Sequence, residues 1–334
     1  TSSGLTFASK KPQKLQEIAY EEKSRIQTKY DELNTVLGGG IVKGSVTLMA
    51  GDPGVGKSTL LLQLALSLSQ TALTVLYVSG EESVEQIKMR AVRIGTSTTS
   101  IKSTKGIKGA KSFDTSDTLD TSDTSFNENL FLVSMTDADT IVTQIEEMKP
   151  DLVVIDSIQT IESQNVSGLS GSVGQVRYGA LQFVRIAKQY NIPIVIVGHV
   201  TKEGMVAGPM VLSHMVDTVL FLEGEKFAKT RILRSFKNRF GPVDEVGIFL
   251  MEGEGMQEAK DPEQLFLPSA NTNTPGSVLI STLEGSRAFL VELQALVVSS
   301  RLPMPRRVVS GLDQRRVELL LAVLQKHCRL PVDT

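Results

Sequence analysis

The pattern of apolar and polar positions along the chain predicts short buried strands alternating with amphipathic helices. Stretches with helical apolar spacing occur at 58–69, 138–148 and 175–190. Between and beside them lie short, largely β-branched apolar runs, at 46–50, 75–78, 152–155, 194–197 and 219–222. Such alternation is typical of a mainly parallel sheet that helices cover on both faces. We therefore expect an α/β core.

One long segment breaks this pattern. Residues 96–127 are rich in Ser, Thr, Lys and Asp, and they carry two copies of Asp-Thr-Ser-Asp-Thr at 114–118 and 120–124. So few apolar residues cannot bury enough surface to offset the entropy of ordering the segment. We expect a disordered surface insertion there; a phosphorylated regulatory loop is the alternative.

The ends of the chain differ in character from its centre. Residues 1–29 are polar and charged and predict a loosely packed leader before a main domain at 30–267. Pro, Asn, Thr and Gly cluster at 268–276, which predicts a linker. Strand-like alternation followed by a helical pattern then indicates a second domain at 277–334. The chain starts with Thr1 and stops soon after that helical pattern, so we expect it to be a piece of a longer polypeptide.

Composition narrows the classes of function. The 334 residues hold 35 Lys and Arg against 37 Asp and Glu, so any binding of nucleic acid requires a local patch of positive charge. The single cysteine, Cys328, excludes an internal disulfide or a multi-cysteine zinc site within these residues. No apolar run approaches the roughly 18–20 residues that span a bilayer, and no membrane partner is expected.

A phosphate-binding pattern, G-x-x-x-x-G-K-[ST], occurs without a mismatch after the first apolar run. Glycines let backbone N–H groups surround a phosphate, the lysine neutralises phosphate oxygens, and the hydroxyl binds Mg²⁺ at a helix N-terminus. A glycine-rich turn without a ligand is the alternative. We expect ATP with Mg²⁺ to be bound by Gly51, Asp52, Pro53, Gly54, Val55, Gly56, Lys57, Ser58 and Thr59.

Hydrolysis of a nucleotide requires a further carboxylate for the metal and a base for the attacking water. Asp156 ends the apolar run 152–155 and is the candidate metal carboxylate. Glu81 and Glu82 follow the run 75–78, at the end of a strand where ligands bind in open α/β sheets. Glu81 is the preferred base; Glu82 also fits a carboxylate that caps the next helix.

At these positions the sequence resembles the bacterial RadA (Sms) family of RecA-superfamily ATPases. The resemblance covers residue 15 to the C-terminal end apart from 96–127, and rests on the segments 28–45, 51–58, 78–83 and 198–204. The pentapeptide Lys-Asn-Arg-Phe-Gly at 237–241 is the most discriminating element. The fold it implies is a RecA-like P-loop core followed by the start of a Lon-protease-like α+β domain.

The resemblance implies a DNA-dependent ATPase, a helicase-like motor that forms hexameric rings and promotes branch migration of recombination intermediates during DNA repair. Its implied partners are single-stranded or branched DNA, other copies of itself and the RecA recombinase. Its implied location is the bacterial cytoplasm, or an organelle such as the chloroplast in a eukaryote.

Roles carry over by position. Glu81 would activate water, Lys57 and Ser58 would hold phosphate and Mg²⁺, and Asp156 would support the metal. His199 would sense the γ-phosphate, with a satisfied histidine at the core's edge as the alternative. Lys237 and Arg239 would reach a neighbouring subunit's nucleotide, and such a cation adds roughly 10³–10⁵ to the rate of phosphoryl transfer; simple exposure to solvent is the alternative.

Two departures from the family pattern limit what carries over. Members usually begin with a four-cysteine zinc motif, and only Cys328 is present here, so zinc is expected only in an N-terminal module outside this sequence. Residues 277–334 cover only the beginning of the Lon-like domain. We expect no protease activity.

DNA contacts are expected where positive charge gathers. Cations occur at 226–239 without a carboxylate between them. The resemblance to RecA-like proteins implies DNA loops at 163–177, where glycines also permit close approach of the backbone to phosphates, and at 201–209. The candidate contacts are Arg177, Lys202, Lys226, Lys229 and Arg231. Aromatic residues make up only 5% of the chain, which favours contacts with the DNA backbone over base stacking. Two alternatives remain open: a signalling ATPase similar to the clock protein KaiC, and a scaffold that binds ATP only to assemble rings.

Overall fold

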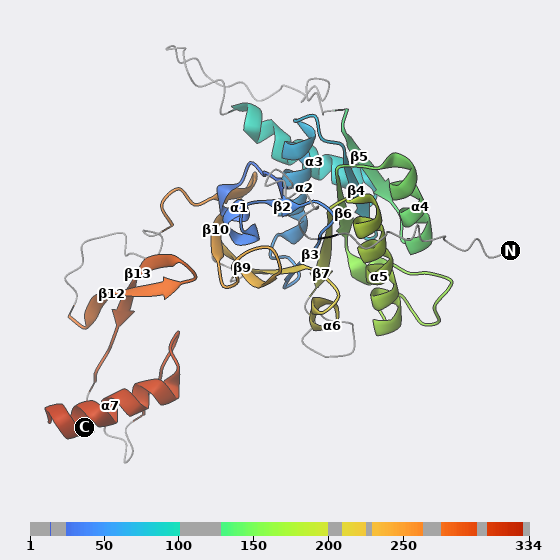
Figure 1. Ribbon diagram of the computed structural model, residues 1–334. Helices are drawn as coiled ribbons and strands as arrows, with labels where there is room; N and C mark the ends of the chain where they lie inside the picture. Colours follow the sequence, from blue (N-terminus) through green and yellow to red (C-terminus); the bar gives the residue numbers. More distant parts are fainter. Residues whose placement is uncertain are drawn as a thin grey trace, which may run out of the picture. The chain divides into compact units, whose positions relative to one another are not determined.

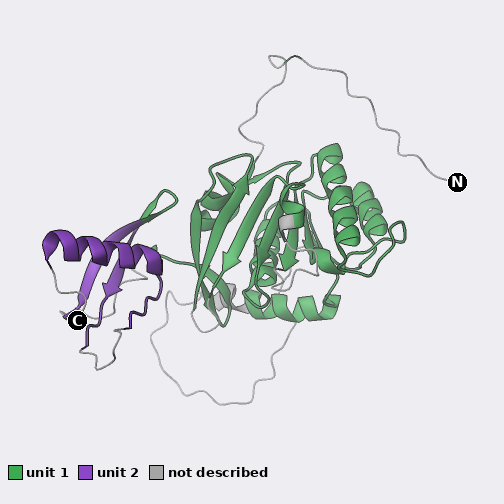
Figure 2. Cartoon of the chain, turned by 90° about the horizontal axis from the view of Figure 1, so that it is seen from below, with its two compact units in different colours: residues 1–262, 283–288 green, residues 263–282, 289–334 purple. Residues whose placement is uncertain are grey.

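The computed structural model describes most of the chain, in two units (Figure 2). The described residues are 14, 25–100, 128–199, 209–224, 229–262, 275–298 and 306–329, with the side chains of 95–100 and 209–210 excepted. The first unit comprises residues 1–262 and 283–288, and the second comprises 263–282 and 289–334. Most of the expected insertion, as well as Lys202 and Lys226, lies outside the described residues.

A nine-stranded sheet forms the first unit, in the order β11-β10-β9-β8-β3-β7-β6-β4-β5 (Figure 1). Its parallel part runs from β8 to β5, and β9, β10 and β11 extend it with antiparallel pairing. The parallel strands are β3 (Val46–Gly51), β4 (Val75–Ser79), β5 (Leu130–Ser134), β6 (Leu152–Asp156), β7 (Ile194–His199) and β8 (Thr218–Glu223). The antiparallel strands are β9 (Thr230–Asn238), β10 (Val246–Glu252) and β11 (Gly255–Glu258).

Helices cover both faces of the sheet, and each face has its own hydrophobic core (Figure 1). One core contains α1 (Asp31–Leu37), α2 (Lys57–Ser69) and α3 (Val84–Ser100). The other contains α4 (Ala138–Met148), α5 (Val173–Tyr190), α6 (Pro209–Ser213) and the 3₁₀ helix η3 (Ile158–Thr160). Strands β3, β4, β6 and β7 send alternate side chains to the two cores, which explains why they read as unbroken apolar runs.

Two boundaries expected from the sequence need correction. Residues 25 and 26 form β1 (Arg25–Ile26), which pairs with β2 (Ile41–Val42), so the leader is not loosely packed up to residue 29. Buried Thr28 also exchanges hydrogen bonds with Asn34 in α1. At the other boundary, α3 continues to Ser100, so residues 96–100 are helical and do not belong to a disordered insertion.

The C-terminal part holds a hairpin of β12 (Ser277–Glu284) and β13 (Arg287–Gln294) and the helix α7 (Gln314–Cys328). The turn of this hairpin, 283–288, groups with the first unit, so the expected division at residue 277 is not clean. Arg287 there binds both carboxylate oxygens of buried Glu32, at 2.8 and 2.9 Å. Within the described part of the chain, no helix has the length and apolarity needed to cross a membrane.

Candidate nucleotide site

The carboxyl ends of four neighbouring parallel strands bring the predicted nucleotide residues together. In the pairing register, Ser79 of β4 lies opposite Asp156 of β6, and Gly51 of β3 lies opposite His199 of β7. Glu81 follows β4 by two residues, and Lys57 follows β3 by six. The sheet therefore places the phosphate loop, two carboxylates and a histidine along one edge, where open α/β sheets bind ligands.

The phosphate loop adopts a backbone that only glycine accommodates easily. Gly54 and Gly56 have φ values of 78° and 111°. At Gly51, a Cβ atom would lie 2.3 Å from the carbonyl oxygen of Leu222, so strand β8 leaves no room for a side chain. A Cβ at Gly54, by contrast, would meet nothing within 4 Å, so the backbone there is open to the approach of a ligand.

Lys57 lies beneath this loop with its ammonium group held by main-chain oxygens. Its Nζ donates to the carbonyls of Gly51 at 2.7 Å and Asp52 at 3.0 Å, and only 3% of the residue is exposed. Burial lowers the pKa of Lys57, while the carboxylates of Asp156, Asp52 and Glu81 act in the opposite direction. A phosphate group would add negative charge beside the ammonium, so the site favours an anionic ligand.

Asp156 keeps one of its carboxylate oxygens engaged inside the protein. The buried Tyr77 hydroxyl donates to its Oδ2 at 2.6 Å. Burial raises the pKa of Tyr77 well above its usual value, and the negative charge of Asp156 raises it further, so the tyrosine stays a neutral donor. This bond fixes the orientation of the carboxylate.

The two candidate bases have different surroundings. Oε1 of Glu81 accepts a 2.5 Å hydrogen bond from the Ser157 hydroxyl and lies 3.3 Å from Nε2 of His199. Glu82 instead pairs with Arg90 at 2.9 Å, a contact that anchors it to α3. Glu81 is thus the carboxylate that the surrounding side chains hold in the site.

A magnesium ion bound together with a nucleotide fits this donor set. Ser58 is the second residue of α2, directly after Lys57, and Asp156 ends the nearby strand β6 with one carboxylate oxygen held by Tyr77. Among the described residues there is no group of three or more His, Cys, Asp and Glu side chains able to hold a metal ion, so phosphate oxygens would have to complete its coordination.

Lys237 and Arg239 lie at the opposite edge of the sheet. Arg239 pairs with Asp217 at 3.1 Å, and the other oxygen of Asp217 accepts the backbone N–H of Val46, the first residue of β3. Lys237 donates to the carbonyls of Ser213 at 2.6 Å and Val216 at 2.8 Å. Burial lowers the pKa of Lys237, and Arg239 lowers it further. Since β3 runs for about 16 Å between its two ends, neither cation reaches the phosphate loop of its own chain.

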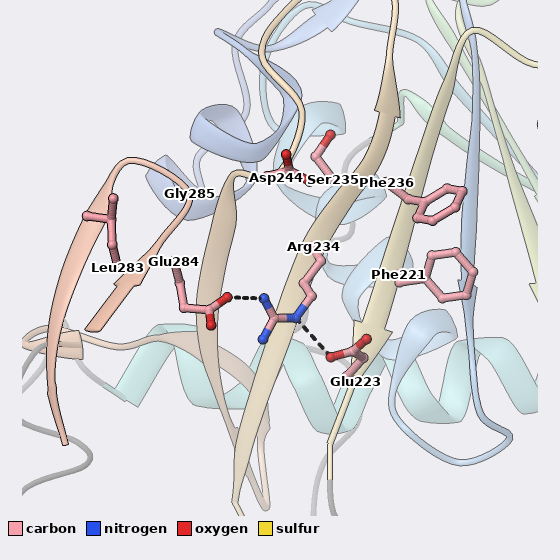
Figure 3. A pocket seen from close by; sticks show the side chains of 9 residues that line it. All are labelled: Phe221, Glu223, Arg234, Ser235, Phe236, Asp244, Leu283, Glu284 and Gly285. Atoms are coloured by element: carbon pink, nitrogen blue, oxygen red, sulfur yellow. Dashed lines mark hydrogen bonds and ion pairs between the residues drawn. The ribbon is translucent and has the colours of Figure 1, made fainter. Parts of the chain in front are cut away.

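The described cations of this row, at 229–239, do not form the uninterrupted positive surface that the sequence suggested. Neighbouring strands and the hairpin turn supply carboxylates that no reading along the sequence reveals. Arg234 binds Glu223 at 3.0 Å and Glu284 at 2.6 Å, beside a depression of about 310 Å³ (Figure 3). Exposed Lys229 lies 3.4 Å from Glu252.

Arg231 departs most from its expected role. It is 7% exposed, and its Nε donates to the carbonyl of Val55 in the phosphate loop at 3.0 Å. This burial excludes the contact with DNA that we expected. The burial of Arg231 follows from the alternation of side chains along β9, because residues 231, 233 and 235 share the buried face.

The glycine-rich segment after β6 is held in place by one buried side chain. Gln175 binds both backbone groups of Ser163 and also donates to the carbonyls of Val166 and Gly168. Arg177, the candidate DNA contact on this segment, lies exposed on α5 about half a turn after Gln175. Of the residues with roles here, Ser157, Tyr77, Gln175 and Arg231 were not recognised from the sequence as parts of the nucleotide site or its supports.

Comparisons with known proteins identify the family. A family model described as an AAA domain matches residues 10–205. The DNA repair protein RadA of Bacillus subtilis strain 168 is 45% identical over 320 residues, which are 96% of this chain and 64% of that protein. The RadA protein of Streptococcus pneumoniae R6 is 44% identical over 326 residues, 98% of this chain and 70% of its own length. The chain belongs to the RadA family.

Membership of the RadA family confirms the resemblance noted above, and the strand order confirms the expected α/β core with a mostly parallel sheet. The chain spans 64% and 65% of the RadA proteins of B. subtilis and Halalkalibacterium halodurans. The crystal structure of the RadB recombinase is similar with a TM-score of 0.49 and 22% identity, over 70% of this chain and 99% of that one. The Lon-like character of residues 277–334 stays a prediction.

The different surroundings of Arg231 and Lys229 predict different effects on stability. Arg231→Met should lower the free energy of unfolding by about 1–3 kcal/mol, because the buried Val55 carbonyl loses its donor. Lys229→Met, the matched control, should change it by less than about 0.5 kcal/mol. Urea unfolding followed by circular dichroism measures both. Equal effects of the two changes would contradict the structural role of Arg231.

Proposed function

We propose that this chain is an ATPase that acts on DNA in recombinational repair. The observation that supports it best is the convergence of Lys57, Glu81, Asp156 and His199 at one sheet edge in a chain of the RadA family. The relatives' name, DNA repair protein, supports the choice of DNA as partner. A cytoplasmic location agrees with their bacterial origin.

Binding of the nucleotide would use the open inside of the phosphate loop. The ammonium group of Lys57 exchanges the carbonyl oxygens of Gly51 and Asp52 for phosphate oxygens, which are stronger acceptors because they are charged. Mg²⁺, when bound with ATP, neutralises phosphate charge, with Ser58 and Asp156 as its protein partners. The Tyr77 hydroxyl would hold one carboxylate oxygen of Asp156 and leave the other for the metal.

Hydrolysis would use Glu81 as the base. Ser157 and His199 hold its Oε1, whereas no described residue donates a hydrogen bond to its Oε2. That oxygen is therefore available to accept the proton of the attacking water. The short bond from Ser157 and the contact with His199 restrict the side chain, which is 44% exposed.

We propose further that nucleotide sites are completed between subunits of a homo-oligomeric ring, with six as the expected number. The position of Lys237 and Arg239 at the far edge of their own sheet supports this, because a cation so placed reaches a nucleotide only if another subunit holds it. Arg239 is 49% exposed, so its guanidinium is accessible from outside.

We propose that the DNA partner is single-stranded or branched and that ATP hydrolysis drives helicase-like translocation along it. The RecA recombinase is the candidate protein partner. Arg177, exposed beside the glycine-rich segment, is the best placed of the described candidate contacts. Lys229 is second, since its weak pairing with Glu252 is solvent-exposed on both sides. Lys202 and Lys226 stay candidates from sequence alone.

ATP turnover with and without single-stranded DNA tests the proposal directly. DNA should raise the rate several-fold at low salt, and the stimulation should fall as salt rises, because contacts with phosphates release counterions. Turnover that DNA leaves unchanged would favour a signalling ATPase of the KaiC kind. Binding of ATP without any turnover would favour the ring-assembly scaffold.

Replacement of the two neighbouring glutamates separates the base from its neighbour. Glu81→Gln should lower kcat by about 10²–10⁴-fold, because the amide cannot accept the water proton, while ATP still binds. Glu82→Gln is the control of the same size and sequence context; it weakens only the contact with Arg90, and kcat should stay within about threefold. Steady-state kinetics and nucleotide binding measure both. Loss of turnover only in Glu82→Gln would reverse the assignment.

Mixed oligomers test action between subunits. Lys57→Ala and Arg239→Ala should each abolish turnover alone, because one removes the phosphate contact and the other removes the cation offered to the neighbour. Mixing them should restore part of the activity, since some interfaces then combine an intact Lys57 with an intact Arg239. Each variant's urea unfolding serves as the control for folding. Absence of any rescue between two folded variants would contradict action between subunits.

A further inference from the structure

The short helix η3 lies between the nucleotide site and the glycine-rich segment. It starts two residues after Asp156. The first part of the glycine-rich segment, residues 163–172 before α5, follows it and is meant by the segment below. One of its residues, Gln159, has no part in the site described above. Its contacts nevertheless reach both regions.

Gln159 joins the two regions through its main chain and its side chain. Its carbonyl oxygen accepts a hydrogen bond from the Ser170 hydroxyl at 3.1 Å, within the glycine-rich segment. Its side-chain Nε2 donates to the carbonyl oxygen of His199 at 3.3 Å. The imidazole of His199 in turn lies 3.3 Å from the Glu81 carboxylate. A continuous chain of contacts therefore leads from the segment to the base.

Two polar atoms at this junction are buried without a partner. Within the described part of the chain, neither Oε1 of Gln159 nor Nδ1 of His199 has a hydrogen-bond partner. Leaving such buried atoms unpaired lowers the stability of the protein. A rearrangement that gives Gln159 Oε1 or His199 Nδ1 a hydrogen-bond partner would therefore be favourable, so ligand binding at the site can shift these side chains.

The neighbouring residue of η3 makes the connection stiff. The Thr160 hydroxyl donates to the carbonyl of Ser157 at 2.8 Å, and a Cβ at Gly80 would lie 2.0 Å from that hydroxyl oxygen. The helix thus packs directly against the turn that carries Glu81. A displacement of η3 cannot leave Glu81 and its partner Ser157 in place.

We propose that Gln159 is a positioning residue that couples the glycine-rich segment to His199 and Glu81, so that nucleotide at the site alters the segment and a polyanion on the segment alters the base. The inference rests on the proposed function, which supplies the nucleotide and the DNA. Coupling of this kind is reciprocal for binding. Gln159 would act through its contacts with Ser170 and His199.

Hydrogen–deuterium exchange of the full chain tests the coupling without DNA. A non-hydrolysable ATP analogue should change the exchange rate of backbone amides in 163–172 at least about threefold in the unmodified protein. In Gln159→Met, which keeps the side chain's size and removes its donor, the analogue should still bind but change this rate less than about 1.5-fold.

Gln175→Met is the matched control. Gln175 ties the same segment through four hydrogen bonds but contacts none of Glu81, Ser157 or His199 in the described structure. Its loss should raise exchange of the segment with and without the analogue, and the ratio of the two rates should stay as in the unmodified protein. If both variants lose the ratio, Gln159 is merely structural and the proposal is overturned.

The outcomes separate this inference from the proposed function. Binding of the analogue without any response of the segment in the unmodified protein overturns the coupling alone. Failure of the analogue to bind overturns both. In ATPase assays, Gln159→Met should reduce the ratio of DNA-stimulated to basal kcat toward one; an unchanged ratio contradicts the proposal even where turnover itself is lower.

Discussion

Register between parallel strands is the constraint on which the candidate site depends. Each of β3, β4, β6 and β7 ends at the same level, so Gly51, Ser79, Asp156 and His199 meet although as many as 148 positions separate the first from the last. A shift by one residue would reverse the face of every side chain on that strand. Two separate apolar cores fix the register, because both faces of these strands are filled. The chemistry at the edge therefore follows from packing in the interior.

Much of this arrangement could be predicted from the sequence because it is written in local patterns. Apolar runs gave the parallel strands β3, β4, β6, β7 and β8 to within a residue or two but missed β5, and the spacing of Gly51, Gly56 and Lys57 is itself the phosphate loop. The choice of Glu81 over Glu82 came from its expected role, and the structure supplies a reason for it in the pairing of Glu82 with Arg90. Glu82 lies just before α3 and Arg90 lies within it, so their pairing depends on the direction of both side chains.

Other features depend on neighbours that are remote in sequence. Arg231 was counted as a surface cation because it lies in a run of cations without a carboxylate, but its place on the buried face of β9 turns it inward to Val55, 176 positions away. Arg234 likewise meets Glu223 across one strand pair and Glu284 from the hairpin turn. Local charge counts miss such partners, since the sheet decides which carboxylate lies beside which cation. The hydroxyl of Ser157, beside Asp156 in the sequence, was overlooked because its partner Glu81 comes from another strand.

Strand β9 carries a mechanical consequence for an assembled ring. Near one end it holds Arg231 against its own phosphate loop, and just past the other end it presents Arg239, about 26 Å away along an extended backbone. Paired with a strand on each side, it is a stiff rod and not a hinge. In the ring proposed above, such a rod would make a subunit's phosphate loop move together with the cation that the same subunit offers to its neighbour's nucleotide. Neighbouring subunits would then be coupled through the sheet itself, and ATP hydrolysis would proceed in order around the ring without a further coupling element.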